Sequence, residues 1–185
     1  MKSNRALLCV CLAAMVAAAT TLRAQGPPLP KPGPEHDLFK QDEGTWDASV
    51  ESFMAPGAPP MTSKGVETNV LGCSGMCLVT NFKGDFGGMP FDGRGTTVYD
   101  SAKKKYVGSW ADSMSTALMV SESTFDSAKK VMTGYMDGPD MTGKIVKMKS
   151  VVEYKADGTR VFTMSSPGPD GKDAVGMRIT YTKRK

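Results

Sequence analysis

The stretch "YVGSWADSM", residues 106–114, combines side chains that could do polar chemistry in an apolar setting. In an extended strand Tyr106, Trp110 and Asp112 share one face, which places a carboxylate two residues beyond a large aromatic ring. Together with Ser113, this carboxylate could orient a small ligand at the rim of an apolar pocket. Asp and Ser also open turns, because their side chains bond backbone amides two residues on. Both interpretations stay open, and the turn is the commoner one.

Other large side chains could line or close such a pocket. A tryptophan in a barrel more often closes the bottom than lines a binding site, so Trp46 is expected to be a structural plug and Trp110 part of the wall. Tyrosine hydroxyls can point into an interior, and one or two of four are expected to do so: Tyr99, Tyr106, Tyr154 and Tyr181. The candidate ligand contacts are therefore Tyr99, Tyr106, Trp110, Asp112, Ser113 and Tyr181.

Nucleophilic catalysis finds little support in the sequence. The sole histidine, His36, stands at the edge of a Pro-rich leader, where we expect an exposed side chain. A Ser/His or Cys/His pair would have to recruit it from outside the main domain, so no catalytic residue is assigned. A carboxylate pair drawn from Glu67, Asp112 and Glu122 stays open for acid–base chemistry, although the sequence does not show that any two of them meet.

Metal and cofactor sites are not expected. A single histidine excludes a histidine-rich metal site. Twelve methionines lie beyond the first 24 residues, and thioethers suit Cu(I), but they occur singly without a Met-x-x-Met cluster. Soft packing around an adaptable pocket explains them better. The glycine-rich segment "KGDFGGMPFDGRG", residues 83–95, lacks the Gly-Lys-Ser/Thr ending of a phosphate-binding loop and is expected to be a mobile loop, or lid, at a barrel mouth.

Cys73 and Cys77 are the two cysteines beyond the N-terminal segment. In a continuous strand their Cα atoms would be about 13 Å apart, whereas a disulfide needs roughly 4.4 to 6.8 Å. They can pair only if "CSGMC" turns back on itself, which Ser74 and Gly75 permit. A disulfide and two reduced, small hydrophobic side chains remain alternatives. The spacing fits no structural zinc site.

The N-terminal residues are expected to be an export signal followed by a tether. Residues 1–24 combine Lys2 and Arg5 with a following apolar run, which is typical of a signal peptide. The run is short for a membrane span and no second one follows, so we expect a periplasmic or secreted protein without stable membrane insertion. Residues 25–34 contain five prolines and are expected to form an extended leader.

The charge balance argues against a nucleic-acid partner. Removal of Lys2, Arg5 and Arg23 with the signal would leave 20 basic residues against 19 acidic ones. Binding to DNA or to an anionic bilayer needs clustered positive charge on one face. Residues 35–185 suffice for one domain with a sizeable core. The sequence leaves the oligomeric state open.

A period of two dominates the chain after one short helix. The segment "EHDLFKQDEG" is expected to form that helix, with Leu38 and Phe39 turned inward and Gly44 ending it. From Thr45 onward apolar and polar residues alternate, as in "TWDASVESFM", "GKIVKMKSVVEYK" and "AVGMRITYTK". The last of these predicts four side chains on one face: Val175, Met177, Ile179 and Tyr181.

Turn signals recur about every dozen residues, and "DSAKK" occurs twice, at 100–104 and 126–130. We expect the same hairpin turn at both places. About ten strands joined in sequence rarely stay open, because a flat sheet leaves two hazardous edges. The expected fold is all-β: an antiparallel meander of about ten strands closed into a barrel over residues 35–185, with a packed or ligand-holding interior.

Four segments also have a familiar pattern: "GTW" at 44–46, "PGAPPMTSKGVET" at 56–68, "VYDSAKKKYVGSWADSM" at 98–114 and the closing "ITYTKRK". Together they resemble the bacterial family called domain of unknown function 1579, over roughly residues 36–185. The resemblance implies a lipocalin-like, calycin barrel in which a Gly-x-Trp near the first strand plugs one end, and it implies no activity. The segment "LGCSGMCLV" departs from the family pattern, so no family-wide role is attached to its two cysteines.

These observations favour a non-enzymatic binding protein, an exported barrel that takes a small, largely apolar ligand in its interior. The first alternative is a structural or interaction domain with a solid core. The second, which the sequence favours less, is an enzyme that uses inward carboxylates or tyrosines.

Overall fold

The computed structural model describes residues 29–55, 58–139, 143–168 and 171–185. The expected signal peptide and the first part of the Pro-rich leader lie outside the described residues. Residues Lys31–Lys185 form one compact unit, and everything below concerns that unit.

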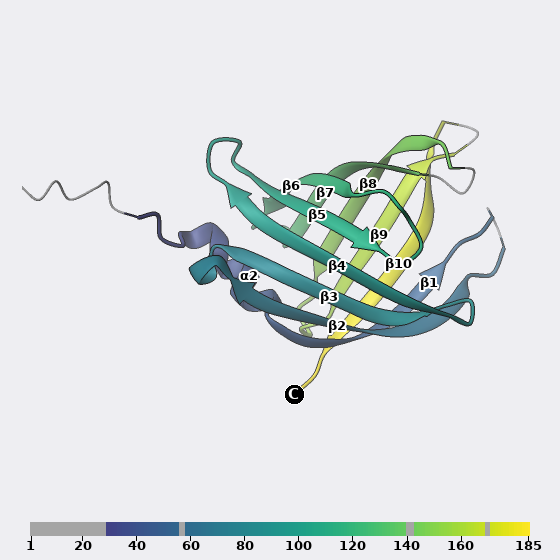
Figure 1. The fold of residues 1–185 in the computed structure, drawn as a ribbon, viewed down its shortest axis with the longest axis horizontal. Helices are drawn as coiled ribbons and strands as arrows, with labels where there is room; N and C mark the ends of the chain where they lie inside the picture. The colour runs from purple at the N-terminus through teal and green to yellow at the C-terminus, as the bar shows by residue number, and fades with distance from the viewer. Residues whose placement is uncertain (1–28, 56–57, 140–142, 169–170) are drawn as a thin grey trace, which may run out of the picture. The chain divides into compact units, whose positions relative to one another are not determined.

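Ten antiparallel strands close into a single barrel (Figure 1). Each strand pairs with its neighbours in sequence, and β1 closes the ring by pairing with β10. The strands are β1 Gly44–Ser52, β2 Met61–Gly72, β3 Cys77–Phe86, β4 Met89–Asp100, β5 Lys105–Asp112, β6 Met119–Asp126, β7 Val131–Pro139, β8 Ile145–Tyr154, β9 Arg160–Pro167 and β10 Asp173–Lys183. The closed meander predicted from the alternation is confirmed.

Side-chain alternation gives each strand a dry and a wet face. In β1, Trp46, Ala48 and Val50 are buried, whereas Asp47 and Ser49 are exposed. Aromatic and branched residues at inward positions suit a pleated, half-buried surface. Burial of one face also determines the register, because a slip by one residue would expose the whole apolar set.

The two "DSAKK" segments form the same turn, as their repetition predicted. Each opens with an aspartate, Asp100 or Asp126, whose Oδ1 accepts hydrogen bonds from the backbone amides two and three residues on. Each ends with a lysine in the left-handed region, Lys104 at φ 54° and Lys130 at φ 56°. The turns join β4 to β5 and β6 to β7, so both lie at the same end of the barrel.

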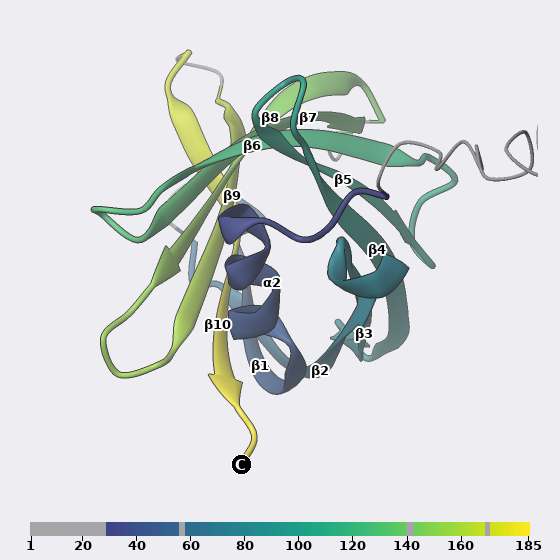
Figure 2. The same ribbon diagram turned by 90° about the vertical axis from the view of Figure 1, so that its left-hand side faces the viewer.

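A short helical segment lies across that same end (Figure 2). It consists of a 3-10 turn η1, Pro34–His36, and the helix α2, Asp37–Asp42. Leu38 and Phe39 turn inward and pack against the barrel, as the sequence predicted. Gly44 takes a φ of 122°, which lets the chain turn from the helix directly into β1. No helix in the described part of the chain is long and apolar enough to cross a bilayer.

The expectation that His36 is exposed is wrong. Its side chain is 8% exposed and packs edge-on against the rings of Phe39 and Tyr99. Its Nδ1 accepts a hydrogen bond from the Gly33 N–H at 3.0 Å. The 3-10 turn folds the imidazole back among the aromatic side chains, so the histidine belongs to the barrel domain and not to the leader.

The glycine-rich segment at residues 83–95 is strand and not a loop. Only Gly87 and Gly88 form a turn; the remainder belongs to β3 and β4, which pair continuously from Phe86–Met89 onward. The many glycines suggested a loop, but several of them lie inside strands because aromatic rings pack onto their backbone, as described below.

Strict alternation also fails at one point in β10. The register with β9 shifts between Val175 and Met177, which makes Gly176 a bulge. Val175 pairs with Ser165, whereas Met177 pairs with the inward-facing Met164. The sequence predicted that Val175 and Met177 share one face, and this prediction is wrong. The inserted residue Gly176 reverses the alternation, so the two side chains lie on opposite faces of the sheet.

Candidate functional site

The inward side chains differ between the two ends of the barrel. Near the helical segment they form a buried polar network, which we call the closed end. Further along the strands the inward side chains are mainly apolar. Val50, Phe82 and Ile179 are buried there, whereas four others are only partly buried, and we define this open half by those four: Phe91, Trp110, Phe162 and Met177. The two regions share the same strands, so the residue types at successive inward positions make the difference.

Trp110 lies over the backbone of β4. A Cβ atom added to Gly93 would overlap the indole ring, and one added to Gly95 would meet it at 3.0 Å. Both glycines are on the inward face, since Gly95 pairs with Trp110 and Gly93 with Asp112. Glycine inside a strand often marks such a close approach. The indole thus packs on the bare backbone of Gly93 and Gly95, the alternate glycines of "FDGRGT", and we call such a surface a glycine bed.

Phe82 lies on a second bed of the same kind. Its ring occupies the space that a Cβ atom would need at Gly65 of β2 and at Gly84 of its own strand. It meets Phe91 edge-on, with 5.8 Å between the ring centroids. With Trp110, these rings make one side of the barrel interior aromatic.

Methionines supply much of the other side. Met136 and Met148 pair across β7 and β8. The sulfurs of Met119 and Met148 lie 3.2 and 3.4 Å from the position that a Cβ atom would take at Gly138. The barrel therefore gathers methionines that are scattered in the sequence, and their flexible thioethers suit an interior of variable shape. No group of three or more His, Cys, Asp or Glu side chains in the described ranges could hold a metal ion.

Asp112 serves both the strand end and the tryptophan. Its Oδ2 accepts a hydrogen bond from Trp110 Nε1 at 3.0 Å, and its Oδ1 accepts one from the Met114 N–H at 2.9 Å. Ser113 is bonded to β4: its N–H donates to the Asp92 carbonyl and its Oγ accepts from the Asp92 N–H. The structure places Asp112 at the end of β5 and Ser113 in the turn that follows, and it gives Asp112 the further role of holding the indole against Gly93 and Gly95.

Arg160 is the centre of the closed end. Its guanidinium bonds the carboxylate of Glu67 and lies 3.3 Å from Asp42 Oδ2. It also stacks over the rings of Trp46 and Tyr181, at 4.6 and 4.4 Å from their centroids. All three charged side chains are buried. A buried charge needs such pairing, because desolvation of an unpaired one is costly.

The closed-end network also fastens the helical segment to the barrel. The carbonyl of Asp42, the last residue of α2, accepts hydrogen bonds from Trp46 Nε1 at 2.9 Å and from Asn69 Nδ2 at 3.1 Å. The hydroxyl of Tyr154 donates to Asp42 Oδ2 at 3.0 Å. One helical residue is thus held by β1, β2 and β8. Trp46, which is 3% exposed, lies where the expected plug would be.

Burial shifts the ionisation of this network. Desolvation raises the pKa of Asp42 above its ordinary value, although the nearby Arg160 acts in the opposite direction. Desolvation also raises the pKa of Tyr154 and of Tyr181 well above the usual range, so both hydroxyls stay protonated. Within the described part of the chain, Asp42 Oδ1 and Arg160 Nε have no hydrogen-bond partner.

The candidate ligand contacts do not form one site. Trp110 and Asp112 belong to the open half, with Ser113 beside them. Tyr181 stacks on the guanidinium of the closed end. Tyr99 and Tyr106 pack edge-on, 5.1 Å between centroids, next to the helical segment.

The three carboxylates considered for acid–base chemistry are far apart in the fold. Glu67 belongs to the closed end, and Asp112 ends β5 in the open half. Glu122 is bonded by Lys103 and Lys105 at 2.6 and 2.7 Å, and these hydrogen bonds lower its pKa to about 2. No pair forms among these three residues.

Sequence reasoning missed Arg160, Asp42 and Asn69. A signal was present for two of them, because Arg160 precedes the inward Phe162 by two residues and Asn69 follows Glu67 by two. Alternation therefore places these polar side chains on the dry face, where they need partners. Asp42 carried no such signal, since it comes from the helix and not from a strand.

Cys73 and Cys77 are joined by a disulfide, with their Cα atoms 5.5 Å apart. The chain turns back through η2, Cys73–Gly75, between β2 and β3. Cys73 and Ser74 both take left-handed φ values, 51° and 57°. The turn that the sequence permitted is therefore formed, and it brings the two sulfurs together at the closed end.

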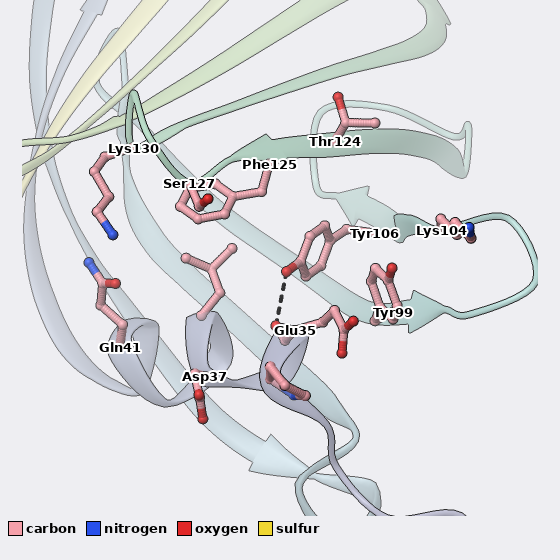
Figure 3. Close-up of a pocket in the computed structure, with 12 residues that line it drawn as sticks. Glu35, Asp37, Gln41, Tyr99, Lys104, Tyr106, Thr124, Phe125, Ser127 and Lys130 are labelled. Carbon is pink, nitrogen blue, oxygen red and sulfur yellow. Dashed lines mark hydrogen bonds between the residues drawn. The ribbon is translucent and has the colours of Figure 1, made fainter.

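A cleft of about 390 Å³ separates the helical segment from the strands beside it (Figure 3). Its walls come from η1 and α2 on one side and from β4, β5, β6 and the twin turns on the other, and they include Leu38, Gln41, Tyr99, Tyr106, Phe125 and Lys130. A second hollow, of about 570 Å³, is lined by Val120, Tyr135 and their neighbours on β5 to β8.

Solved structures of distant proteins have the same barrel. Rv2717c from M. tuberculosis superimposes with a TM-score of 0.61 at 11% sequence identity, over 83% of this chain and 99% of that one. The S-type phycobiliprotein lyase CPES from Guillardia theta superimposes with a TM-score of 0.55 at 12% identity, over 82% of this chain and 93% of the lyase. At these identities the likeness shows the shared fold alone. A search of curated proteins finds no match.

The family match covers most of the chain. Residues 31–183 match a family described as protein of unknown function (DUF1579). The matched range contains the helical segment and all ten strands, and it confirms the resemblance found in the sequence. The chain therefore belongs to the DUF1579 family.

Proposed function

We propose that this protein binds a small, largely apolar ligand in the open half of its barrel. The observation that carries the proposal is the contrast in burial along the inward face. Trp46 is 3% and Ile179 is 6% exposed, whereas Phe91, Trp110 and Met177 remain partly exposed. A solid core would bury these side chains as fully as the first two. Aromatic and flexible apolar groups on a concave surface are typical of a small-molecule site.

The polar groups of the open half are engaged by the protein itself. Asp112 holds the Trp110 indole and the following turn, and Ser113 is bonded to Asp92. The ligand is therefore held mainly by apolar contact. Each 100 Å² of apolar surface that it buries would contribute about 2.5 kcal/mol before the cost of association is subtracted.

The comparison with the phycobiliprotein lyase agrees with a barrel that holds a small molecule. The lyase's reaction is not carried over, because 12% identity supports the fold and not a shared chemistry. The proposal therefore rests on the inward face of this chain.

We also propose that the protein is exported. The charged and then apolar beginning of the sequence supports this proposal, and so does the Cys73–Cys77 disulfide, because disulfides persist in oxidising compartments. Fractionation of cells that express the tagged full chain tests it. A protein retained in the cytoplasm at its full mass would contradict export.

Nuclear magnetic resonance of the two tryptophan indoles tests the ligand proposal. Trp110 Nε1–H donates to Asp112 in the open half, and Trp46 Nε1–H donates to Asp42 at the closed end. Titration with the neutral probe N-phenyl-1-naphthylamine should shift the Trp110 signal saturably and leave the Trp46 signal in place. The variant W110F assigns the two signals.

The matched control is V98S, which removes an apolar side chain that is 39% exposed. It should bind the probe as the wild type does, whereas W110F should bind it several times more weakly. Absence of a saturable shift at Trp110, or equal weakening by V98S and W110F, would overturn the proposal in favour of surface adsorption or a solid core.

A further inference from the structure

The cleft beside the helical segment is separate from the open half. It lies at the end where β5 begins, at Lys105, whereas the open half lies where β5 ends, at Asp112. A strand of this length spans about 25 Å. The two regions therefore lie near opposite ends of β5, and a small ligand in one does not reach the other.

The floor of the cleft is apolar and preformed. Leu38 is 6% exposed and packs in one cluster with Tyr106 and Phe125. The Tyr106 hydroxyl donates to the Glu35 carbonyl at 2.9 Å, which holds its ring against the helical segment (Figure 3). Burial raises the pKa of Tyr106 to about 12, so this hydroxyl remains a neutral donor. The floor can therefore accept a flat hydrocarbon or aromatic body.

The two acidic side chains at the cleft lie away from Lys130. In Figure 3 the Asp37 carboxylate is directed to the outer side of the helical segment, and the Glu35 carboxylate lies beside Tyr99, at the other side of the cleft from Lys130. Asp37 is also engaged by Lys40, whose Nζ lies 2.7 Å from Asp37 Oδ1. Among the residues that the structure describes, neither carboxylate forms an ion pair with Lys130 on the opposite wall.

A cation points into the cleft from that opposite wall. Lys130 ends the second "DSAKK" turn, and its side chain extends across the opening toward the amide of Gln41 (Figure 3). Neither side chain has a hydrogen bond or ion pair among the residues that the structure describes. Lys129, in the same turn, instead pairs with Asp126 at 3.3 Å and is directed to solvent. Of the two lysines in this turn, Lys129 is therefore paired with Asp126, and Lys130 faces the cleft.

We propose that the cleft is a second binding site, and that it takes a small organic carboxylate whose apolar body lies on Leu38, Tyr106 and Phe125 while its anionic group meets Lys130. The volume of about 390 Å³ falls within the range of small-molecule sites. Of the two lysines that line the cleft, Lys104 lies at the opposite side in Figure 3, so one ammonium, that of Lys130, lies beside the Gln41 amide. This pair matches a monoanion, because a phosphate would call for an arginine fork or several backbone donors. The Gln41 side chain supplies a further polar contact once the carboxylate is in place.

Titration of the full chain with 2-naphthoate, followed by NMR and calorimetry, tests the site. The wild type should bind saturably, with shifts at Tyr106 and Phe125 and none at the Trp110 indole. K130M keeps the length of the side chain but removes its charge, and should weaken binding about ten- to hundredfold. The matched control K129M removes the neighbouring charge from the same turn and should leave binding unchanged.

A neutral analogue, 2-naphthalenemethanol, separates the anionic contact from the apolar one. It should bind the wild type more weakly than naphthoate does, and it should bind K130M and the wild type equally. Equal weakening of naphthoate by K129M and K130M would overturn the proposal, since it would indicate attraction by surface charge alone. A naphthoate shift confined to the Trp110 indole would also overturn it, because the ligand would then occupy the open half, and that result would leave the proposed function standing.

Discussion

The closed end and the open half of this barrel are built on the same strands, yet their inward residues are held in place by different interactions. At the closed end, Arg160 joins two carboxylates and lies against two aromatic rings, so polar groups position one another. In the open half, the glycines beneath Trp110 and Phe82 let both rings lie against the backbone, and one hydrogen bond, from Trp110 Nε1 to Asp112, adds to this contact. In the first arrangement each polar group depends on its partners, whereas the second leaves the Trp110 ring partly exposed.

The contrast shows that a barrel can be fixed at one end and adaptable at the other. A buried polar network is costly to leave half satisfied, which favours a single geometry. Methionines and rings on a flat glycine bed have no such requirement and can adjust to a ligand. Substitutions in the two regions should therefore differ in size and in kind.

The largest expected effect comes from R160M. This substitution leaves Glu67 and Asp42 buried without their cation, and removal of one partner from a buried pair costs about 3 to 5 kcal/mol. Unfolding in urea measures the loss. The control R178M removes a guanidinium that lies 3.6 Å from Glu51 on the surface, and should cost less than about 1 kcal/mol. Equal losses would mean that the network does not hold the closed end together.

G93A should break the open half in a different way. Its new Cβ would overlap the Trp110 ring, and such overpacking costs up to about 3 kcal/mol. Displacement of the indole from Asp112 should also shift the tryptophan emission maximum, which R178M should not do. In the matched variant G176A the added Cβ meets nothing within 4 Å, so stability and emission should stay near the wild-type values. Unchanged emission in G93A would show that the ring does not use the glycine bed.

The disulfide should have an intermediate effect that is confined to the closed end. It closes a loop of five residues from Cys73 to Cys77, for which chain entropy predicts about 2 kcal/mol of stabilisation. The double variant C73S/C77S should lose that amount, and should no longer respond to a reductant. The indole signal of Trp110 should not move. A change at Trp110 would contradict the separation of the two regions.

The smallest effect concerns pH. Burial raises the pKa of Asp42 in the folded state, so the folded protein holds this proton more tightly than the unfolded chain does. The contribution of Asp42 to the free energy of unfolding is fully present below the pKa that this residue has in the unfolded chain. It is lost as the pH rises through the higher pKa of the folded state. The unfolding free energy of the wild type, relative to that of D42N, should therefore decrease as the pH rises above 3.8, the ordinary pKa of an aspartate. A difference that grows with pH would contradict the shift.

D47N provides a control of opposite sign. The hydrogen bond from Arg184 lowers the pKa of Asp47 on the surface. The contribution of Asp47 to the free energy of unfolding should therefore be present above its pKa in the unfolded chain and be lost as the pH falls. The change should be small, because the Asp47–Arg184 pair is exposed.

Alternation and turn spacing were sufficient to predict the barrel, because both are local consequences of a sheet with one dry face. The helix was predictable for the same reason, from Leu38, Phe39 and the glycine that follows. The wrong face predicted for Val175 shows the limit of this reasoning. A single bulge residue, Gly176, moves the β10 side chains that precede it to the opposite face of the sheet.

The sites were harder to predict because they depend on which inward positions become neighbours around the ring. Arg160 and Glu67 are 93 residues apart in sequence yet bonded to each other. The glycine beds were mistaken for a loop, because a glycine that supports a ring and a glycine in a turn look alike in one sequence. His36 was misplaced because its partners, Phe39 and Tyr99, come from two different elements.

The pairing of β1 with β10 also bears on how the chain reaches its native state. Trp46 lies opposite Lys183, 137 residues further along the chain, so the ring cannot close until β10 has been made. Until then the first strand has an unpaired edge. Contacts between such distant residues slow folding. During synthesis the chain therefore passes through an open sheet with unpaired edges, which a chaperone would have to protect from aggregation.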